Sequence, residues 1–256
     1  MEANILEIDI SNLKSNIEVI KGFIGPYVKF LAVVKADAYG HGIKLVSRYL
    51  DNVDRFGVAN VEEAIKLREN GISKPILIMG DIFPSDLKDI LYYNITPSVS
   101  SIEIAKLISK KGLEENRKVP IHIKVDTGMG RFGFLVEELL MSIDKILELP
   151  NLELEGIFSH FSAAGVDKNY VDLQFRRFIE LISVLERRRI FFSLKHIANS
   201  PATLIHPYTT MDMVRIGLAM YGINPTKSQL PVELSPVMSL KSRVLTIRNI
   251  PEDWSI

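Results

Sequence analysis

The residue with the clearest chemical potential is a lysine that ends an apolar run. Residues 30–34 are five apolar residues, rich in the β-branched and aromatic types that favour a buried strand, and Lys35 follows them directly. A lysine at the C-terminal end of a buried strand is desolvated, which lowers the pKa of its amine and allows it to form a Schiff base with a carbonyl. The plainer interpretation is a lysine that only marks the solvated end of the strand.

Further polar residues occur where other apolar runs end. They are Tyr39 in the loop after Lys35, Lys124 and Arg131 around the fifth run, His160 after the sixth, Asn199 and Ser200 after the seventh, and Arg215, Gly217 and Leu218 at the eighth. Side chains at the C-terminal ends of parallel strands meet at one face of a barrel, so we expect these residues to lie close together.

The apolar runs alternate with helical patterns along the whole chain. Strands are predicted at residues 30–35, 55–59, 75–79, 95–99, 121–126, 154–160, 194–198 and 213–217. Helices are predicted at residues 43–50, 61–69, 85–92, 102–110, 135–149, 172–188 and 202–206. This alternation predicts an α/β protein with a closed (β/α)8 barrel, the TIM-barrel architecture. The alternative, an open doubly wound sheet, would usually carry a Gly-rich first turn of the dinucleotide-binding type, and none is present.

Two segments fall outside the eight-fold pattern. Residues 4–10 predict a short strand, and Asp9 or Ser11 can cap the helix that follows to about residue 24. Residues 241–250 predict a further strand. We therefore expect a barrel domain at residues 1–236, and at residues 237–256 the start of a β-rich domain whose remainder is missing.

The composition excludes several classes of function. The 31 basic and 31 acidic residues balance and form no long block, which argues against nucleic acid and acidic membranes as partners. Cysteine is absent, which excludes disulfides, thiolate metal sites and a cysteine nucleophile, and no metal site is predicted. No signal peptide or membrane span is found, so the expected location is the cytoplasm.

The strand-end residues together favour pyridoxal 5'-phosphate as the cofactor. Asn199-Ser200-Pro201 can open a helix whose amides bind phosphate, and Gly217 lets its backbone approach an anion closely. Lys35 would hold the cofactor as a Schiff base. Arg215 is the candidate partner of the pyridine nitrogen, and because an arginine donates without giving up its proton, the ring would be a weaker electron sink than beside an aspartate.

Four segments resemble the signatures of bacterial alanine racemases, in the family's order. They are Ala32-Val-Val-Lys35-Ala-Asp-Ala-Tyr39-Gly-His-Gly42, Lys124-Val-Asp-Thr-Gly-Met-Gly-Arg131-Phe-Gly, His196-Ile-Ala-Asn199-Ser200-Pro and Val214-Arg215-Ile-Gly217-Leu-Ala-Met-Tyr-Gly222. The resemblance covers essentially all of the chain. It implies a cytoplasmic isomerase that interconverts L-alanine and D-alanine through an aldimine on Lys35 and supplies D-alanine for cell-wall peptidoglycan.

The resemblance also implies a role for each predicted site residue. Lys35 is the acid/base on one face of the cofactor, and Arg215, backed by His160, pairs with the pyridine nitrogen. The phosphate side takes Tyr39, Asn199, Ser200, Gly217 and Leu218. Arg131 is expected near the substrate carboxylate, and Lys124 matches a position that is carbamylated in some members, where it would hold Arg131.

One part of the family's machinery has no match. Racemisation needs an acid/base on each face of the substrate, and in the family the second is a tyrosine of the C-terminal β-domain, contributed across a homodimer. We therefore expect this chain to bind the cofactor but to racemise poorly alone.

Serine, lysine and ornithine remain alternative substrates of such a racemase. A non-enzymatic cofactor carrier is the rival function, and Arg215 argues against a decarboxylase, which is expected to use a carboxylate at the ring nitrogen.

Overall fold

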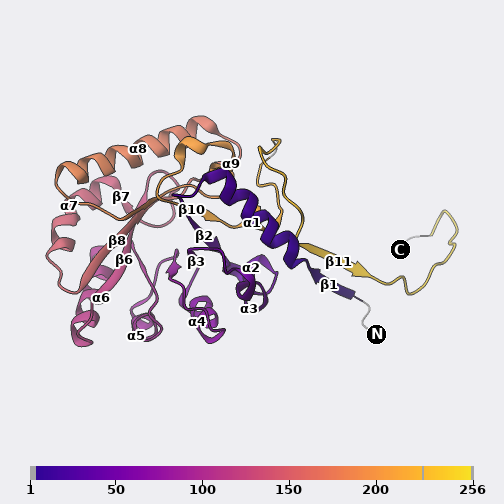
Figure 1. The fold of residues 1–256 in the computed structure, drawn as a ribbon, viewed down its shortest axis with the longest axis horizontal. Helices are drawn as coiled ribbons and strands as arrows, with labels where there is room; N and C mark the ends of the chain where they lie inside the picture. The colour runs from indigo at the N-terminus through magenta and orange to yellow at the C-terminus, as the bar shows by residue number, and fades with distance from the viewer. Residues whose placement is uncertain (1–3, 227, 255–256) are drawn as a thin grey trace.

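The computed structural model of the chain describes residues 4–226 and 228–254. Within these ranges, eight parallel strands form the centre, one for each predicted apolar run (Figure 1). They are β2 (Lys29–Val33), β3 (Arg55–Val58), β4 (Ile76–Ile78), β5 (Ser98–Val99), β6 (Val119–Asp126), β8 (Leu152–Phe158), β9 (Leu194–His196) and β10 (Met213–Ile216). A two-residue strand, β7 (Phe134–Leu135), lies beside the end of β6.

The strands close into a barrel. Parallel ladders join them in the orders β10-β2-β3-β4 and β5-β6-β8-β9. A parallel bridge between Leu77 and Thr96 connects β4 to the segment that leads into β5, and a bridge between Asn199 and Arg215 connects the segment after β9 to β10. The circle is therefore complete, and the predicted (β/α)8 barrel is confirmed.

The predicted helical patterns all correspond to helices, which cover the outside of the strands. They are α3 (Ile43–Val46), α4 (Val61–Glu69), α5 (Leu87–Tyr92), α6 (Ile102–Glu114), α7 (Val136–Leu147), α8 (Lys168–Arg187) and α9 (Ser200–Ile205). Several start at a side-chain cap: Asn60 accepts the amide of Glu63, and Asp167 accepts that of Tyr170. Among the described residues, none of these helices is both long and apolar enough to cross a membrane.

Alternation along the strands divides the core into two layers. Phe30 and Ala32 of β2 belong to the large cluster beneath the helices, whereas Leu31 and Val33 pack in a smaller cluster with residues of β4, β9 and β10. The same period of two sends alternate residues of every strand into the barrel interior. Polar side chains at these positions are therefore enclosed by the barrel wall.

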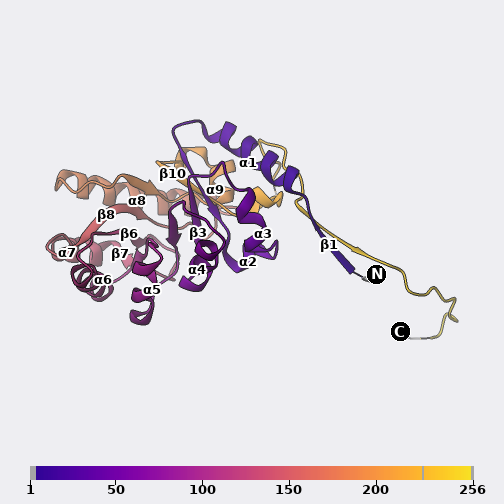
Figure 2. The ribbon, with the colours of Figure 1, turned by 60° about the horizontal axis from the view of Figure 1, so that its bottom comes forward.

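A two-stranded ribbon projects from the barrel (Figure 2). It pairs β1 (Asn4–Ile8) with β11 (Met238–Ser242) in antiparallel register, and Asp9 caps the helix α1 (Ile10–Ile24), as predicted. The strand predicted at residues 241–250 is wrong beyond Ser242. The reason is pairing: β1 offers five residues, its described part begins at Asn4, and no described segment lies beside residues 243–254 to continue the ladder.

Candidate active site

A cavity of about 170 Å³ opens at the C-terminal ends of the strands. The predicted residues Lys35, Lys124, Arg131, His160 and Arg215 all line it. The two groups on which the cofactor hypothesis depends, the Lys35 amine and the Arg215 guanidinium, therefore face one space. A larger cleft, of about 550 Å³, lies outside the barrel beside α7 and α8, and neither of these two groups lines it.

Lys35 begins a left-handed turn, α2 (Lys35–Tyr39). The φ angles of Ala36, Asp37, Ala38 and Tyr39 are 51°, 52°, 56° and 55°. Because a Cβ crowds the backbone in this conformation, each such residue costs about 1–2 kcal/mol, and surrounding contacts must hold the turn. Burial lowers the pKa of Lys35, the nearby Arg131 lowers it further, and the carboxylate of Glu63 opposes both effects.

The predicted phosphate-side residues converge from three loops. The Gly217 amide donates to Ser200 Oγ at 3.0 Å, and a Cβ on Gly217 would lie 2.6 Å from Tyr39 Oη. Asn199 caps α9 by accepting the amide of Ala202 at 3.2 Å. Leu218 follows Gly217 and opens the short helix η4 (Leu218–Tyr221). A side chain at position 217 would therefore have to displace the Tyr39 ring.

Arg215 is buried and held by the surrounding barrel. Its Nη1 donates to His196 Nδ1 at 2.8 Å, and its Nη2 donates to the Ser159 carbonyl at 2.7 Å, the Ile197 carbonyl at 3.0 Å and His160 Nδ1 at 3.1 Å. Burial lowers its pKa to about 9, which still leaves the guanidinium protonated at neutral pH. No hydrogen bond from Nε to another described residue is found, so this donor is free for a group in the cavity.

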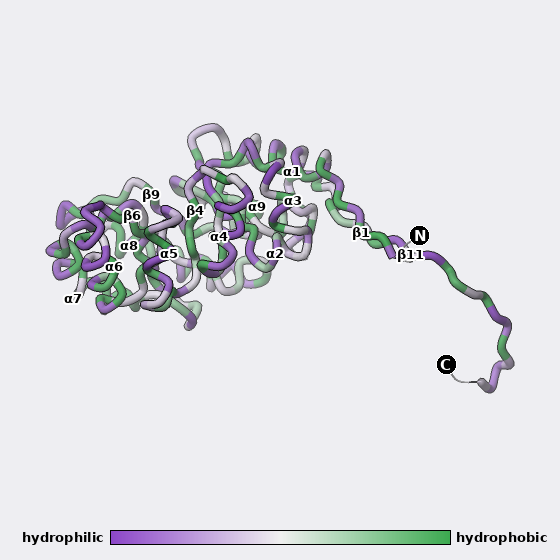
Figure 3. The backbone as a smooth tube through the Cα atoms, turned by 90° about the horizontal axis from the view of Figure 1, so that it is seen from below, coloured by the Kyte–Doolittle hydropathy of each residue, from purple (hydrophilic) through white to green (hydrophobic). Residues whose placement is uncertain are grey.

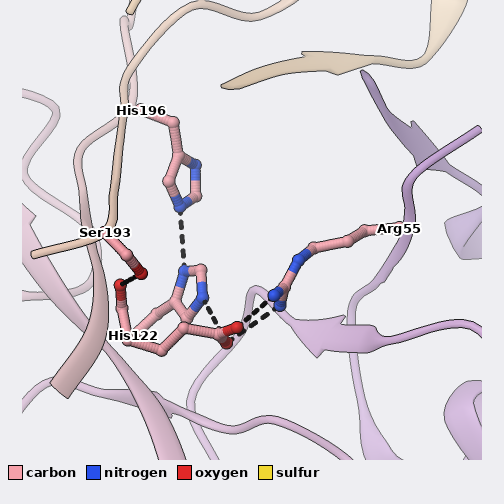
Figure 4. A network of polar contacts seen from close by, with 5 residues as sticks. Arg55, His122, Ser193 and His196 are labelled. Atoms are coloured by element: carbon pink, nitrogen blue, oxygen red, sulfur yellow. Dashed lines mark hydrogen bonds and ion pairs between the residues drawn. The ribbon is translucent and has the colours of Figure 1, made fainter. Parts of the chain in front are cut away.

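A column of polar residues, buried except for the partly exposed Glu155, continues from Arg215 into the barrel. Figure 4 shows its part from His196 through His122 to Arg55. His196 Nε2 lies 2.9 Å from His122 Nδ1, and His122 Nε2 lies 3.1 Å from Glu155 Oε2. Glu155 is also paired with Arg55, the first residue of β3. The column thus joins the cavity at one end of the barrel to the opposite end.

The direction of these hydrogen bonds follows from elementary chemistry. A guanidinium only donates, so His196 Nδ1 must accept and its proton sits on Nε2, which donates to His122. His122 in turn donates from Nε2 to the carboxylate of Glu155. Burial lowers the pKa of both histidines, which keeps them neutral. Burial alone would raise the pKa of Glu155, but hydrogen bonds from His122 and Arg55 outweigh it and lower the pKa to about 2.

Sequence reasoning missed the part of this column that lies beyond His196. His122, Glu155 and Arg55 come from three strands and carry no motif of their own. The available signal was the period of two, because His122 precedes Lys124 by two residues and so shares its inward face. Nothing in the sequence paired His122 or Arg55 with Glu155.

The loop after β6 presents Arg131. Asp126 accepts the amides of Gly128, Met129 and Arg131 at 2.8, 2.7 and 2.9 Å, which folds the loop around its carboxylate. Lys124 donates to the Met79 carbonyl, and its Nζ lies 4.8 Å from the centre of the Phe132 ring. Burial lowers the pKa of Lys124 to about 8. In its protonated form Lys124 repels Arg131, so the bond expected between them depends on the carbamylation of Lys124, which stays a prediction.

Comparison with known proteins identifies the family. A sequence model of the alanine racemase N-terminal domain matches residues 8–225. The chain belongs to the alanine racemase family. It is 41% identical to alanine racemase 1 of Caldanaerobacter subterraneus subsp. tengcongensis over 258 residues, covering 98% of this chain and 66% of that protein. It is 42% identical to an alanine racemase of Methanococcus maripaludis over 256 residues, covering 98% and 69%.

Solved structures give the same result. An alanine racemase of Clostridium difficile 630 in complex with cycloserine superposes with a TM-score of 0.93 at 34% identity, covering 97% of this chain and 70% of that one. A histidine racemase of Leuconostoc mesenteroides subsp. sake superposes with a TM-score of 0.88 at 28% identity, covering 96% and 67%. The chain spans about two thirds of the length of the curated relatives it matches. Alanine racemases depend on pyridoxal phosphate, in agreement with the predicted cofactor.

Proposed function

We propose that the protein is a pyridoxal-phosphate-dependent racemase that interconverts L-alanine and D-alanine, using Lys35 to hold the cofactor. The observation that carries the proposal is the shared cavity of Lys35 and Arg215, with Tyr39, Ser200 and Gly217 gathered nearby. When bound, the cofactor withdraws electrons from the substrate Cα and so acidifies its proton. The proposed setting is the cytoplasm, where the product would supply cell-wall peptidoglycan.

Each residue has a defined task in this proposal. Lys35, whose pKa burial lowers, is assigned to move the Cα proton on one face. Arg215 offers its Nε–H to the ring nitrogen, while His160 accepts from Nη2 and holds the guanidinium. The phosphate group is assigned to one set of residues: Tyr39, Asn199, Ser200, Gly217 and Leu218.

We assign the substrate carboxylate to Arg131. Carbamylation of Lys124 would replace a cation by an anion beside Arg131 and turn repulsion into a charge-assisted hydrogen bond. The motivation is geometric: both side chains line the cavity, and the pKa of Lys124, lowered to about 8, leaves part of its amine neutral and reactive.

We further propose that residues 1–236 form the cofactor-binding domain and that residues 237–256 begin a second, β-rich domain, which pairs barrels in a homodimer. Two observations support this: β11 leaves the barrel in an exposed ribbon, and the curated relatives are longer than this chain.

No tyrosine lines the cavity in the described part of the chain. The chain alone should therefore bind cofactor and racemise poorly, because the second face lacks its acid/base.

The test separates binding from turnover. The purified chain is mixed with pyridoxal phosphate, reduced with borohydride and digested, and the modified peptide is identified by mass spectrometry. We expect the label on Lys35 and none in Lys35→Ala. D-alanine is then assayed after incubation with L-alanine. A label elsewhere would refute the assignment of Lys35, and turnover at the rate of a longer relative would refute the predicted impairment.

The choice of substrate needs its own assay. The likeness to a histidine racemase shows that this fold accommodates a different amino acid, so alanine, serine, lysine, ornithine and histidine should be compared with a chain extended by the second domain. Alanine should be turned over fastest. Cofactor binding without racemisation by the extended chain would favour the carrier function instead.

A further inference from the structure

Glu63 makes contacts that its own helix does not require. It is the third residue of α4, where a glutamate commonly accepts the amide of the residue that caps its own helix. Here the cap is Asn60, and Glu63 instead reaches two other amides. Its Oε1 accepts from Ala36 at 2.6 Å, and its Oε2 accepts from Ala59 at 2.8 Å.

Both of these amides flank the cavity. Ala36 follows Lys35 and is the first residue of the left-handed turn with a positive φ, while Ala59 follows β3 and lines the cavity itself. The carboxylate therefore ties the end of β2 to the end of β3 at the barrel mouth. Hydrogen bonds from amides to a carboxylate are charge-assisted and stronger than neutral ones, so this bridge can offset part of the strain of the turn.

We propose that Glu63 is a positioning residue for Lys35: its carboxylate clamps the entrance of the left-handed turn and so sets the direction in which the lysine enters the cavity. This proposal rests on the proposed role of Lys35. Within the turn, Asp37 Oδ1 accepts the amide of Ile43 at 2.8 Å, so the strained segment is also tied to the first residue of α3.

Glu63 also acts on the charge of Lys35. The groups that share the cavity with this lysine are Arg131 and Lys124 from the β6 region, His160 after β8 and Arg215 on β10. Arg131 lowers the pKa of Lys35, whereas Glu63 raises it. The clamp and the charge can be separated by substitution. Glu63→Gln keeps the length and loses the charge, while Glu63→Asp keeps the charge and is too short to reach both amides.

The experiment compares these two variants with Glu62→Gln. Glu62 is the exposed neighbour on the same helix, so this control removes the same charge nearby without touching the turn. Three quantities are measured in the full chain: amide hydrogen exchange of residues 36–40, the pH dependence of Lys35 acetylation by competitive labelling, and the dissociation constant of pyridoxal phosphate.

We expect both Glu63 variants to exchange faster at residues 36–40 and to bind pyridoxal phosphate about tenfold more weakly, or about 1.4 kcal/mol. Lys35 acetylation at a fixed pH should rise about threefold in Glu63→Gln, where the opposing charge is lost, and stay near wild type in Glu63→Asp. Glu62→Gln should match wild type throughout.

Glu63 variants that match Glu62→Gln in both hydrogen exchange and cofactor affinity would overturn the clamp. If one of the two Glu63 variants does not fold, the same comparison of the other with Glu62→Gln still tests the clamp. If wild type itself fails to attach the cofactor to Lys35, the proposed function fails, while hydrogen exchange and acetylation of the cofactor-free chain still test the clamp.

Discussion

Four basic side chains share the small cavity at the barrel mouth: Lys35, Lys124, Arg131 and Arg215. No aspartate or glutamate of the described residues lines it. Burial and mutual repulsion lower the pKa values of the two lysines, which are therefore more easily neutral than a lysine in water. A cavity of this kind is suited to ligands that bring negative charge, as a phosphorylated cofactor and a substrate carboxylate do.

Carbamylation of Lys124 is a prediction at this scale. In buffer with ¹³C-bicarbonate near pH 8, where the pKa of about 8 leaves the amine partly neutral, we expect a carbamate signal in the ¹³C NMR spectrum. Lys124→Ala should lose this signal. Its presence at equal intensity in the variant, or its absence from wild type, would contradict the prediction.

Gly217→Ala tests the phosphate side. The new Cβ would lie 2.6 Å from Tyr39 Oη and must displace the Tyr39 ring, so the affinity for pyridoxal phosphate should fall at least about tenfold, or about 1.4 kcal/mol. Gly22→Ala is the matched control. Nothing lies within 4 Å of its Cβ in α1, so this change should leave binding unaltered and stabilise the helix by about 0.5–1 kcal/mol. Equal affinities for the two variants would exclude the predicted displacement.

At the scale of elements, the barrel strands hold the histidine column in one orientation. Each polar group in it has its partner on a different strand: Arg215 on β10, His196 on β9, His122 on β6, Glu155 on β8 and Arg55 on β3. From Arg215 through His196 and His122 every link donates toward the Glu155 carboxylate, and Arg55 donates to the same carboxylate from the other side. Glu155 thereby stabilises the arrangement of the Arg215 guanidinium, although two histidines separate them.

Glu155→Leu should destabilise the fold by on the order of 3 kcal/mol, because it leaves Arg55 and His122 without their acceptor. Arg55→Met combined with Glu155→Leu should recover much of this loss, since the unpaired cation is removed too. Urea unfolding of the two variants and wild type measures both effects. A double variant as unstable as the single one would show that the cost lies in packing rather than in the unpaired charge.

The same pair predicts a pH dependence. The folded-state pKa of Glu155 is about 2, below its ordinary value of 4.5, so the folded state resists protonation more than the unfolded state does. The stabilisation is fully present above about pH 4.5 and is lost as the pH falls toward 2. The free energy of unfolding should therefore fall less steeply with acid in the double variant than in wild type. Parallel curves would contradict this contribution.

At the scale of the whole molecule, the barrel and the segment after it differ in burial. The barrel buries its apolar side chains beneath helices, whereas beyond β11 several large ones are exposed: Val244 is 75%, Leu245 86%, Ile247 85% and Trp254 64% exposed. Figure 3 shows apolar residues along this extended segment. Apolar side chains exposed in series commonly mark a surface that packs against another part of a protein.

Deleting residues 243–256 should leave the barrel intact, because the described residues among them, 243–254, form no strand with β1. We expect the affinity of the shortened chain for pyridoxal phosphate to lie within about twofold of that of the full chain, because changes at distant sites are usually energetically independent. Binding of a hydrophobic dye should decrease. Loss of cofactor binding would place part of the site in the deleted segment, against the proposed domain boundary.

The fold was largely predictable because the sequence patterns that specify its strands and helices are local. Eight apolar runs with intervening helical patterns specify the strands and helices, and residues such as Asn60 show where a helix begins. The end of β11 was not predictable, since residues 241–250 have the composition of a strand, whereas the described pairing with β1 runs only from Met238 to Ser242. Likewise, the sequence did not predict the φ angles of 51–56° at residues 36–39, because residues other than glycine ordinarily avoid this conformation.

The sequence by itself determined which residues could do chemistry and that a barrel would bring Lys35 and Arg215 to one end. Those conclusions depend on periodicity and motif, which are properties of neighbours in the chain. Only the tertiary structure decided that His122 meets Glu155 and that Glu63 reaches past its own helix to Ala36. Such contacts join residues far apart in sequence, and their geometry is fixed by how the closed barrel packs its strands and helices, which no local pattern encodes.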